Sequence, residues 1–149
     1  MNQPAALNEL PALPDEHRAR PKSDWLIDPS PFAAGAFRGS DDREIVLSNG
    51  LISRTWRLAP SAATVGYDNL VTGEPVIRAA RPESVLELAG LRSDVGGLVC
   101  ADDQAHMPRS WLDALHTDPA ALAYRGYTVR PTFAPFARPL HRHAHHPTW

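Results

Sequence analysis

The dipeptide Asn49-Gly50 places the tightest constraint on how this chain can fold. It separates two short segments rich in apolar residues, EIVLSN at 44–49 and LISRTWRL at 51–58. Asn-Gly is the strongest short signal for a β-hairpin, because both residues tolerate the positive φ angles that a type I′ turn requires. The sequence therefore predicts that the two segments are antiparallel strands joined by a tight turn.

The second of these strands alternates in polarity. An extended chain places Ile52, Trp56 and Leu58 on one face, with Arg54 interrupting it. The opposite face carries polar side chains: Ser53, Thr55 and Arg57. An antiparallel strand with one apolar and one polar face is typical of a sheet that packs on a core and meets water on its other side. We therefore predict that the polar face is exposed.

Short strands and turns continue on both sides of this pair. AGAFRG precedes it at 34–39, across the polar connection SDDR at 40–43. AATVGYDNL, EPVIRA and ESVLELAGLRSDVGG follow it, with turns expected at Thr72-Gly73 and Ala89-Gly90. About six to eight short strands at close spacing indicate a sandwich or part of one. The predicted fold is mainly β, an incomplete antiparallel β-sandwich over residues 32–136.

One or two short helices interrupt the strands. Three residues at helical spacing follow Pro108, namely Trp111, Leu112 and Leu115. Proline is tolerated in a first helical turn, so this pattern predicts a short helix near 109–116. Asp118-Pro119 has the form of an N-cap and first-turn pair, which predicts a second short helix. The segment AYRGYTVRPTF after it again has the composition of a strand.

Residues 1–23 differ from the rest of the chain. They carry four prolines and mixed charge without a sustained hydrophobic period, a composition typical of segments outside a packed core. We expect residues 1–23 to form a flexible leader. Residues 24–149 are then predicted to form an N-terminal β-sandwich domain that is truncated at its C-terminal end.

The charge and hydrophobicity of the chain exclude two classes of partner. Its 15 basic and 17 acidic residues give a formal net charge of −2, whereas nucleic acids and anionic membranes are bound by a concentrated basic face. Its apolar runs are far shorter than the ~20 residues of a membrane-spanning helix. Asn8, Glu9 and nearby prolines interrupt any signal-peptide core. The single cysteine, Cys100, cannot form an internal disulfide. The sequence therefore does not define the localisation, although it slightly favours the cytoplasm.

The acidic residues do not form a recognisable catalytic pair. Glycoside hydrolysis needs two carboxyl groups facing each other across a sugar, about 5.5 Å apart in retaining enzymes and roughly 6.5–9.5 Å apart in inverting ones. Asp41-Asp42 and Asp102-Asp103 are instead neighbours in sequence whose side chains diverge. Because aspartate favours turns, we interpret both pairs as solvated turn residues.

Other candidate catalytic groups have simpler structural explanations. His106, Ser110 and Asp113 can be drawn as a triad, but they lack the strand–turn–helix setting that exposes a nucleophile. Cys100 with His106 would form a thiol–imidazole pair, although a cysteine after the apolar run GLV is more typical of a small buried residue. The glycines of DVGGLV, without a Walker lysine, indicate a turn or bulge. The sequence thus predicts no catalytic, cofactor-binding or metal-binding residue and no cofactor.

The four tryptophans divide into two pairs. Trp56 and Trp111 lie in amphipathic patterns and are expected in the core. Trp25 and Trp149 flank irregular segments. A flat aromatic ring suits the apolar side of a sugar as well as a protein core, so these two are the better candidates for contact with a ligand or another surface.

The last ten residues, LHRHAHHPTW, concentrate four histidines: His141, His143, His145 and His146. Structural zinc sites hold their ligands on rigid elements with supporting partners, whereas no cysteine or carboxylate lies near these histidines in sequence. We expect adventitious metal binding at most, and no structural metal centre. The tail is interpreted as the point of truncation, which would leave Phe133, Phe136 and Trp149 exposed.

Part of the chain resembles a known family. LSNGLISRTWRLAPSAATVGYDNLVTGEPVIRAARPES at 47–84, DVGGL at 94–98 and SWLDAL at 110–115 are similar to the N-terminal region of large glycoside hydrolases of the α-galactosidase (melibiase) type. The resemblance extends over residues 24–149. Most of it is carried by four short motifs: Ser48-Asn49-Gly50, Asn69-Leu70, Thr72-Gly73-Glu74 and Arg78.

The resemblance implies a parent enzyme that hydrolyses terminal α-galactosyl or related linkages by a retaining mechanism. In such enzymes an N-terminal β-sandwich precedes a (β/α)₈ barrel that holds the catalytic aspartates, and nothing in this chain matches those residues. The resemblance therefore implies that this chain is a non-catalytic domain and is inactive alone. Its implied partners are the missing barrel and the carbohydrate that the parent enzyme binds. Homo-oligomerisation stays open. The alternatives are a free-standing carbohydrate-binding or interaction module, and a truncated product without independent function.

Overall fold

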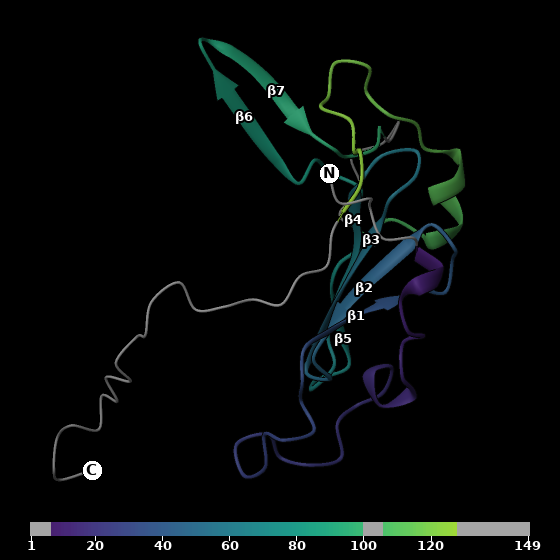
Figure 1. The fold of residues 1–149 in the computed structure, drawn as a ribbon, viewed down its shortest axis with the longest axis vertical. Coiled ribbons are helices and arrows are strands. Elements are labelled where there is room, and N and C mark those ends of the chain that lie inside the picture. The colour runs from purple at the N-terminus through teal and green to yellow at the C-terminus, as the bar shows by residue number, and fades with distance from the viewer. Residues whose placement is uncertain (1–6, 100–105, 128–149) are drawn as a thin grey trace, which may run out of the picture.

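The computed structural model describes residues 7–99 and 106–127, which form a mainly β fold (Figure 1). One antiparallel sheet has the strand order β1-β2-β3-β4-β5, and a second sheet contains β6 and β7. The strands are β1 Gly35–Arg38, β2 Glu44–Ser48, β3 Ile52–Arg57, β4 Ala63–Asn69, β5 Glu74–Ile77, β6 Ser84–Leu88 and β7 Leu91–Val95. Within these ranges the helices are short 3-10 turns: η1 Leu7–Glu9, η2 Asp15–His17 and η3 Arg109–Ala114. The predicted mainly β, antiparallel class is confirmed.

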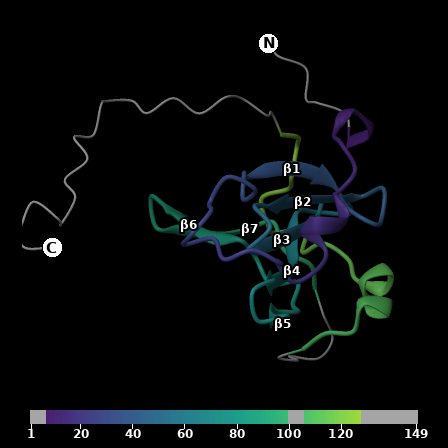
Figure 2. The same cartoon turned by 90° about the horizontal axis from the view of Figure 1, so that it is seen from below.

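The five-stranded sheet is a meander, because each strand pairs with its neighbour in sequence. Figure 2 shows β1 to β5 following one another across the sheet. The pairing of β2 with β3 aligns Ile45 with Trp56 and Ser48 with Ser53, which confirms the predicted hairpin. A register shift between Thr55 and Trp56 marks a bulge opposite β4.

The turn at Asn49-Gly50 differs from the predicted type I′ geometry. Among the residues of this turn, all of them described, only Gly50 has a positive φ, +79°. The Asn49 side chain accepts hydrogen bonds from the backbone N–H groups of Leu51 and Ile52, both at 3.0 Å. Asparagine therefore stabilises a longer connection through its side chain rather than through a left-handed backbone.

The turn at Ala89-Gly90 has the tighter geometry instead. Leu88 pairs directly with Leu91, so the connection between β6 and β7 contains two residues. Their φ angles are +51° and +80°, the pattern of positive values that a type I′ turn requires.

Strand β3 buries the face that was predicted to be exposed. Ser53 and Arg57 are 7% and 2% exposed, whereas Ile52 on the other face is 42% exposed and Trp56 is half-buried. The polar side is the one that the N-terminal segment and η3 cover, and carboxylates neutralise the Arg57 guanidinium there. The prediction that Ser53, Thr55 and Arg57 face water is wrong.

The apolar core lies at one end of this covered face. Its buried members are Ala63, Val65, Ala80, Leu98, Met107 and Leu112. Gly96 and Gly97, with φ of +64° and +85°, bring the chain close to its neighbours after β7. A Cβ on Gly97 would lie 2.7 Å from the Pro82 nitrogen, so only glycine fits there. This bend agrees with the turn predicted in DVGGLV.

The predicted helix at 109–116 forms as the 3-10 turn η3, with Pro108 as its N-cap. Leu112 is buried, but Trp111 is 38% exposed, so the expectation that Trp111 belongs to the core is wrong. The second predicted helix is absent from residues 118–127. The Asp118 carboxylate instead accepts a hydrogen bond from the Ala120 N–H at 2.8 Å, which forms a turn.

The N-terminal segment lies against the sheet, although the sequence predicts a leader outside the core. The backbone N–H of Arg38 donates to the Pro11 carbonyl at 2.8 Å. His17 is buried and packs edge-on against Phe37, with ring centroids 5.2 Å apart. The Arg20 guanidinium donates to the Val71 carbonyl at 2.7 Å. Residues 11–20 therefore cover part of the polar face of β2 and β3.

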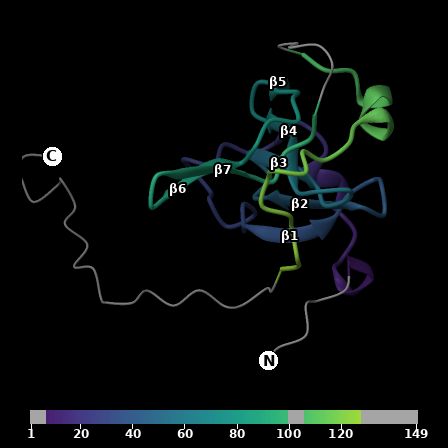
Figure 3. The ribbon, with the colours of Figure 1, turned by 90° about the horizontal axis from the view of Figure 1, so that it is seen from above.

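The β6–β7 hairpin extends away from the five-stranded sheet, as Figure 3 shows. Its paired residues alternate, so one side presents Leu86, Leu88 and Leu91. Leu88 and Leu91 are 70% and 75% exposed. The stability of a two-stranded hairpin whose apolar face is exposed to solvent depends largely on its turn and its cross-strand contacts.

Candidate functional site

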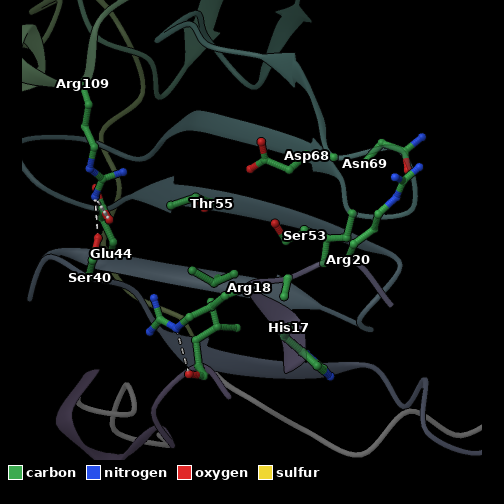
Figure 4. Close-up of a pocket in the computed structure, with 15 residues that line it drawn as sticks. His17, Arg18, Arg20, Ser40, Glu44, Ser53, Thr55, Asp68, Asn69 and Arg109 are labelled. Atoms are coloured by element: carbon green, nitrogen blue, oxygen red, sulfur yellow. Dashed lines mark hydrogen bonds and ion pairs between the residues drawn. The ribbon is translucent and has the colours of Figure 1, made fainter. Parts of the chain in front are cut away.

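A cleft lies between residues 13–20 and the covered face of the sheet (Figure 4). We call it the polar cleft. Its volume of about 360 Å³ falls in the range of pockets that hold small molecules. It is lined by Leu13, His17, Arg18, Ala19, Arg20, Ser40, Glu44, Val46, Ser53, Thr55, Asp68, Asn69, Leu70, Gly73 and Arg109.

Alternation along the strands places polar side chains on the floor of the polar cleft. Ser53 and Thr55 lie two residues apart on β3, and the register pairs Ser53 with Asp68 of β4 and with Ser48 of β2. Residues that face each other across antiparallel strands point to the same side of a sheet. The floor is thus a row of hydroxyl groups ending at a carboxylate.

One end of the polar cleft is built around Glu44, which is 1% exposed. Its Oε2 accepts a 2.5 Å hydrogen bond from Nη2 of Arg109, and the same Nη2 donates to the Ser40 hydroxyl at 3.0 Å. Its Oε1 lies 3.7 Å from Nη1 of Arg57 and accepts no hydrogen bond. A buried carboxylate oxygen that accepts no hydrogen bond is costly, because the nearby charge of Arg57 offsets only part of its desolvation.

The other end combines an acid, an amide and a guanidinium. Asp68 is paired with Arg78, which lies beside Gly66. Asn69 accepts hydrogen bonds at its Oδ1 from two backbone N–H groups of the following turn, those of Val71 and Thr72. Arg20 is anchored through Nε to the Val71 carbonyl. Figure 4 shows Asp68, Asn69 and Arg20 on the side of the cleft opposite Glu44 and Arg109.

An ion-pair network lies behind the Glu44 end and joins η3 to the sheet. Arg57 contacts Asp41, Glu44 and Asp113, and Arg43 donates to Asp41 at 2.7 Å and to Asp113 at 2.7 Å. The hydrogen bonds from Arg43 hold the pKa of both aspartates below the usual range. These carboxylates stay ionised and serve to position η3.

The outer face of the sheet carries a second polar cluster around Glu83. Glu83 Oε2 accepts from Arg54 Nη2 at 2.5 Å and from the Trp56 indole at 3.0 Å, and its Oε1 accepts from the Thr64 N–H. Burial would raise the pKa of Glu83, but the hydrogen bonds from Thr64 and Trp56 outweigh it and the pKa is lowered. The Arg54 guanidinium lies 4.4 Å from the Trp56 ring centroid, a cation–π contact. The indole is therefore engaged through both its N–H and its ring.

The residues singled out from the sequence have different places in the structure. Asp42 is exposed as predicted, but Asp41 is half-buried in the ion-pair network, so its interpretation as a solvated turn residue is wrong. Asp113, Ser110 and His106 are all exposed, and Asp113 is held by two arginines. No hydrogen bond joins these three among the described contacts. The backbone N–H groups of Gly96 and Gly97 donate to carbonyl groups instead of facing an open cradle.

Several candidates lie outside the described residues: Cys100, Asp102, Asp103, Phe133, Phe136, His141, His143, His145, His146 and Trp149. Trp25 is described and is 45% exposed. Across 7–99 and 106–127, no group of three or more histidine, cysteine or acidic side chains is arranged to hold a metal ion. None of the helices in those ranges has the length and apolarity to cross a membrane.

The polar cleft was missed from the sequence because its parts are far apart along the chain. The alternation of Ser53, Thr55 and Arg57 is visible in the sequence, but this pattern by itself predicts a face in contact with water. The available signal is an arginine near the end of the second strand, Arg57, whose pairing position on the first strand carries an acidic residue, Glu44. Opposite charges on directly paired strand residues indicate mutual neutralisation.

No model of a known protein family matches the chain, and comparisons with curated proteins and with solved structures find no match either. The chemistry of its own residues is therefore the basis for assigning a role to the site.

Proposed function

We propose that this chain is a non-catalytic β domain of a glycoside hydrolase of the α-galactosidase type, acting beside a barrel that carries catalysis. The resemblance of residues 47–84, 94–98 and 110–115 to the N-terminal region of that family supports the assignment. The mainly β, antiparallel fold is the class that the resemblance implies. Fold class alone does not define a function, so the side chains carry the rest of the argument.

The condition of the carboxylates supports a non-catalytic role most directly. A glycosidase needs one carboxyl group with a raised pKa as general acid, opposite a second carboxylate. Among the described residues, Asp41, Glu83 and Asp113 have lowered pKa values because arginines or other donors bind them. Glu44 and Asp68 are likewise paired with arginines. Side chains held in ion pairs of this kind are suited to stabilising the fold.

Exposed apolar surface supports a role beside another domain. The β6–β7 hairpin presents Leu86, Leu88 and Leu91 on one side, and Val76 and Ile77 of β5 are also exposed. Large exposed apolar side chains of this kind are often covered by a partner. A packed catalytic barrel is the partner that the resemblance implies.

Two measurements test this proposal. Residues 1–149, purified and incubated with aryl α-galactosides, are expected to show no turnover. The reading frame that follows codon 149 in the genomic DNA is expected to continue into a sequence with eight alternating strands and helices. Turnover by the purified chain that is lost in the Asp102→Asn or Asp103→Asn variant would contradict the proposal, and so would a downstream sequence that encodes no barrel.

The alternative of a carbohydrate-binding module gains its support from the polar cleft. An aromatic platform on the outer face is the usual basis for such a module, but Arg54 covers the Trp56 ring and Glu83 engages its indole N–H. The polar cleft offers hydrogen-bonding groups in its place.

A further inference from the structure

We propose that the polar cleft binds an uncharged polyhydroxylated ligand, a single pyranose ring of a saccharide. The class of ligand follows from the lining of the cleft. The expectation that the sugar is a galactoside rests on the proposed function.

The lining offers donors and acceptors side by side. Glu44 and Arg109 stand together at one end, and Asp68 and Arg20 stand at the other. A sugar hydroxyl donates one hydrogen bond and accepts others, as serine and threonine hydroxyls do. It therefore matches a site in which each carboxylate acceptor is close to a guanidinium donor.

The charges of the polar cleft disfavour ionic ligands. Three arginines line it, Arg18, Arg20 and Arg109, together with two carboxylates, Glu44 and Asp68. Glu44 is already paired with Arg109 and Asp68 with Arg78, so neither carboxylate is free to hold a cation, and an anion would lie beside a carboxylate at either end. Like charges in a partly dry site repel strongly, because the local dielectric is low. A neutral ligand avoids both penalties.

The shape and the apolar groups of the polar cleft fit one sugar ring. Leu13, Val46 and Leu70 contribute apolar surface beside the polar side chains, and a pyranose presents C–H groups between its hydroxyls. The volume of about 360 Å³ lies near the lower limit for small-molecule pockets. One ring is the occupant that this size supports.

A buried carboxylate oxygen that accepts no hydrogen bond gives independent support for a ligand. Glu44 is 1% exposed, and its Oε1 accepts no hydrogen bond. A ligand hydroxyl group that donates a hydrogen bond to this oxygen would remove the cost of leaving a buried acceptor unsatisfied. Glu44 lines the polar cleft, but Oε1 itself is shielded from solvent, so a bound hydroxyl group reaches it only after the carboxylate turns towards the cleft.

The test is a titration of the ¹⁵N-labelled full chain, followed by NMR. Added D-galactose is expected to shift the backbone amide signals of Ser53, Thr55 and Asn69 in a saturable way, and equal concentrations of sodium sulfate are expected to leave them unshifted. The Thr55→Val variant keeps the side-chain shape and removes one hydroxyl. Loss of one hydrogen bond is expected to weaken binding about 3- to 10-fold. The matched variant Thr117→Val lies outside the cleft and is expected to bind as the wild type does.

The outcomes separate this inference from the proposed function. Equal binding of D-glucose and D-galactose supports the saccharide site and removes its link to α-galactosidases. Shifts with sulfate and none with either sugar overturn the inference in favour of an anion site. Absence of any shift, or equal weakening in Thr55→Val and Thr117→Val, also overturns it. In those cases the downstream reading frame still tests the proposed function independently.

Discussion

At the scale of single residues, Arg57 explains why the sequence misleads about strand β3. Its position in an alternating strand predicts a solvated side chain, yet it is 2% exposed. The burial is possible because Asp41, Glu44 and Asp113 surround the guanidinium. Two of these partners could be guessed from their closeness to β2, but Asp113 lies 56 positions away in sequence. The alternation of residue types predicts which side chains share a face of the strand. It does not predict which charged residues from elsewhere in the chain contact that face.

The network predicts a specific response to acid at Asp41. Its pKa lies below the ordinary value of 3.8 because Arg43 donates to it. A carboxyl group whose pKa is lowered by folding stabilises the native state above the unfolded value, and this contribution is lost as the pH falls through the folded value. We expect Asp41→Asn to lower the free energy of unfolding by about 1 to 3 kcal/mol at neutral pH. Below pH ~4 the difference from the wild type should shrink.

Urea unfolding curves recorded from pH 7 to pH 2 measure this effect. Asp42→Asn is the matched control, because Asp42 is the neighbouring residue and its side chain is almost fully exposed. Its curves should follow those of the wild type at every pH. A constant gap between Asp41→Asn and the wild type over the whole range would refute the assignment of acid sensitivity to this carboxylate.

At the scale of elements, the strands and their turns are what the sequence predicts best. The segments 44–49 and 51–58 pair as expected, and the turns at Thr72-Gly73 and Ala89-Gly90 also occur between strands. Local patterns suffice because each strand of the meander pairs with its neighbour in the chain. Turn types are less predictable: Asn49 uses its side chain, whereas Ala89 takes a positive φ that its residue type does not favour.

The strain at Ala89 predicts a stabilising substitution. An alanine in the left-handed region costs about 1–2 kcal/mol, and asparagine tolerates that region better. Ala89→Asn creates an Asn-Gly pair at a two-residue turn and is expected to stabilise the β6–β7 hairpin by about 0.5–1 kcal/mol. Amide hydrogen exchange at Leu86 and Ser93 is the measurement, because these paired residues are hydrogen-bonded across the strands and a projecting hairpin opens independently of the rest of the fold.

A second variant controls for effects unrelated to backbone conformation. Gly90 at the same turn has a φ of +80°, and a Cβ added there would meet open space. Backbone strain is therefore the only cost expected for the Gly90→Ala substitution. Exchange should become faster in this variant and slower in Ala89→Asn. Slower exchange in both would show that turn conformation does not limit the hairpin.

At the scale of the whole molecule, the position of the N-terminal segment decides whether the polar cleft exists. Prolines and mixed charge predict that residues 1–23 stay apart from the core. The structure uses the same prolines in an extended path along β1, where the Pro11 carbonyl accepts from the Arg38 N–H. Composition indicates that such a segment does not form a core of its own. It carries little information on whether the segment packs against a sheet formed by other residues. The polar cleft could not be predicted, because residues 13–20, which cover it, belong to the segment that the sequence predicts to be a flexible leader.

His17 provides the sharpest test of that packing. It is 7% exposed, packs against Phe37 and lies 3.4 Å from where a Cβ on Gly50 would be. Replacing a buried ring with a methyl group leaves a cavity, so His17→Ala is expected to lower the free energy of unfolding by about 1 to 3 kcal/mol. The matched control is His116→Ala, because His116 is exposed and its change should stay within about 0.5 kcal/mol. Guanidinium unfolding midpoints of both variants provide the measurement. Equal stability of His17→Ala and the wild type would show that residues 11–20 do not hold the sheet, and that the polar cleft lacks the roof on which its ligand depends.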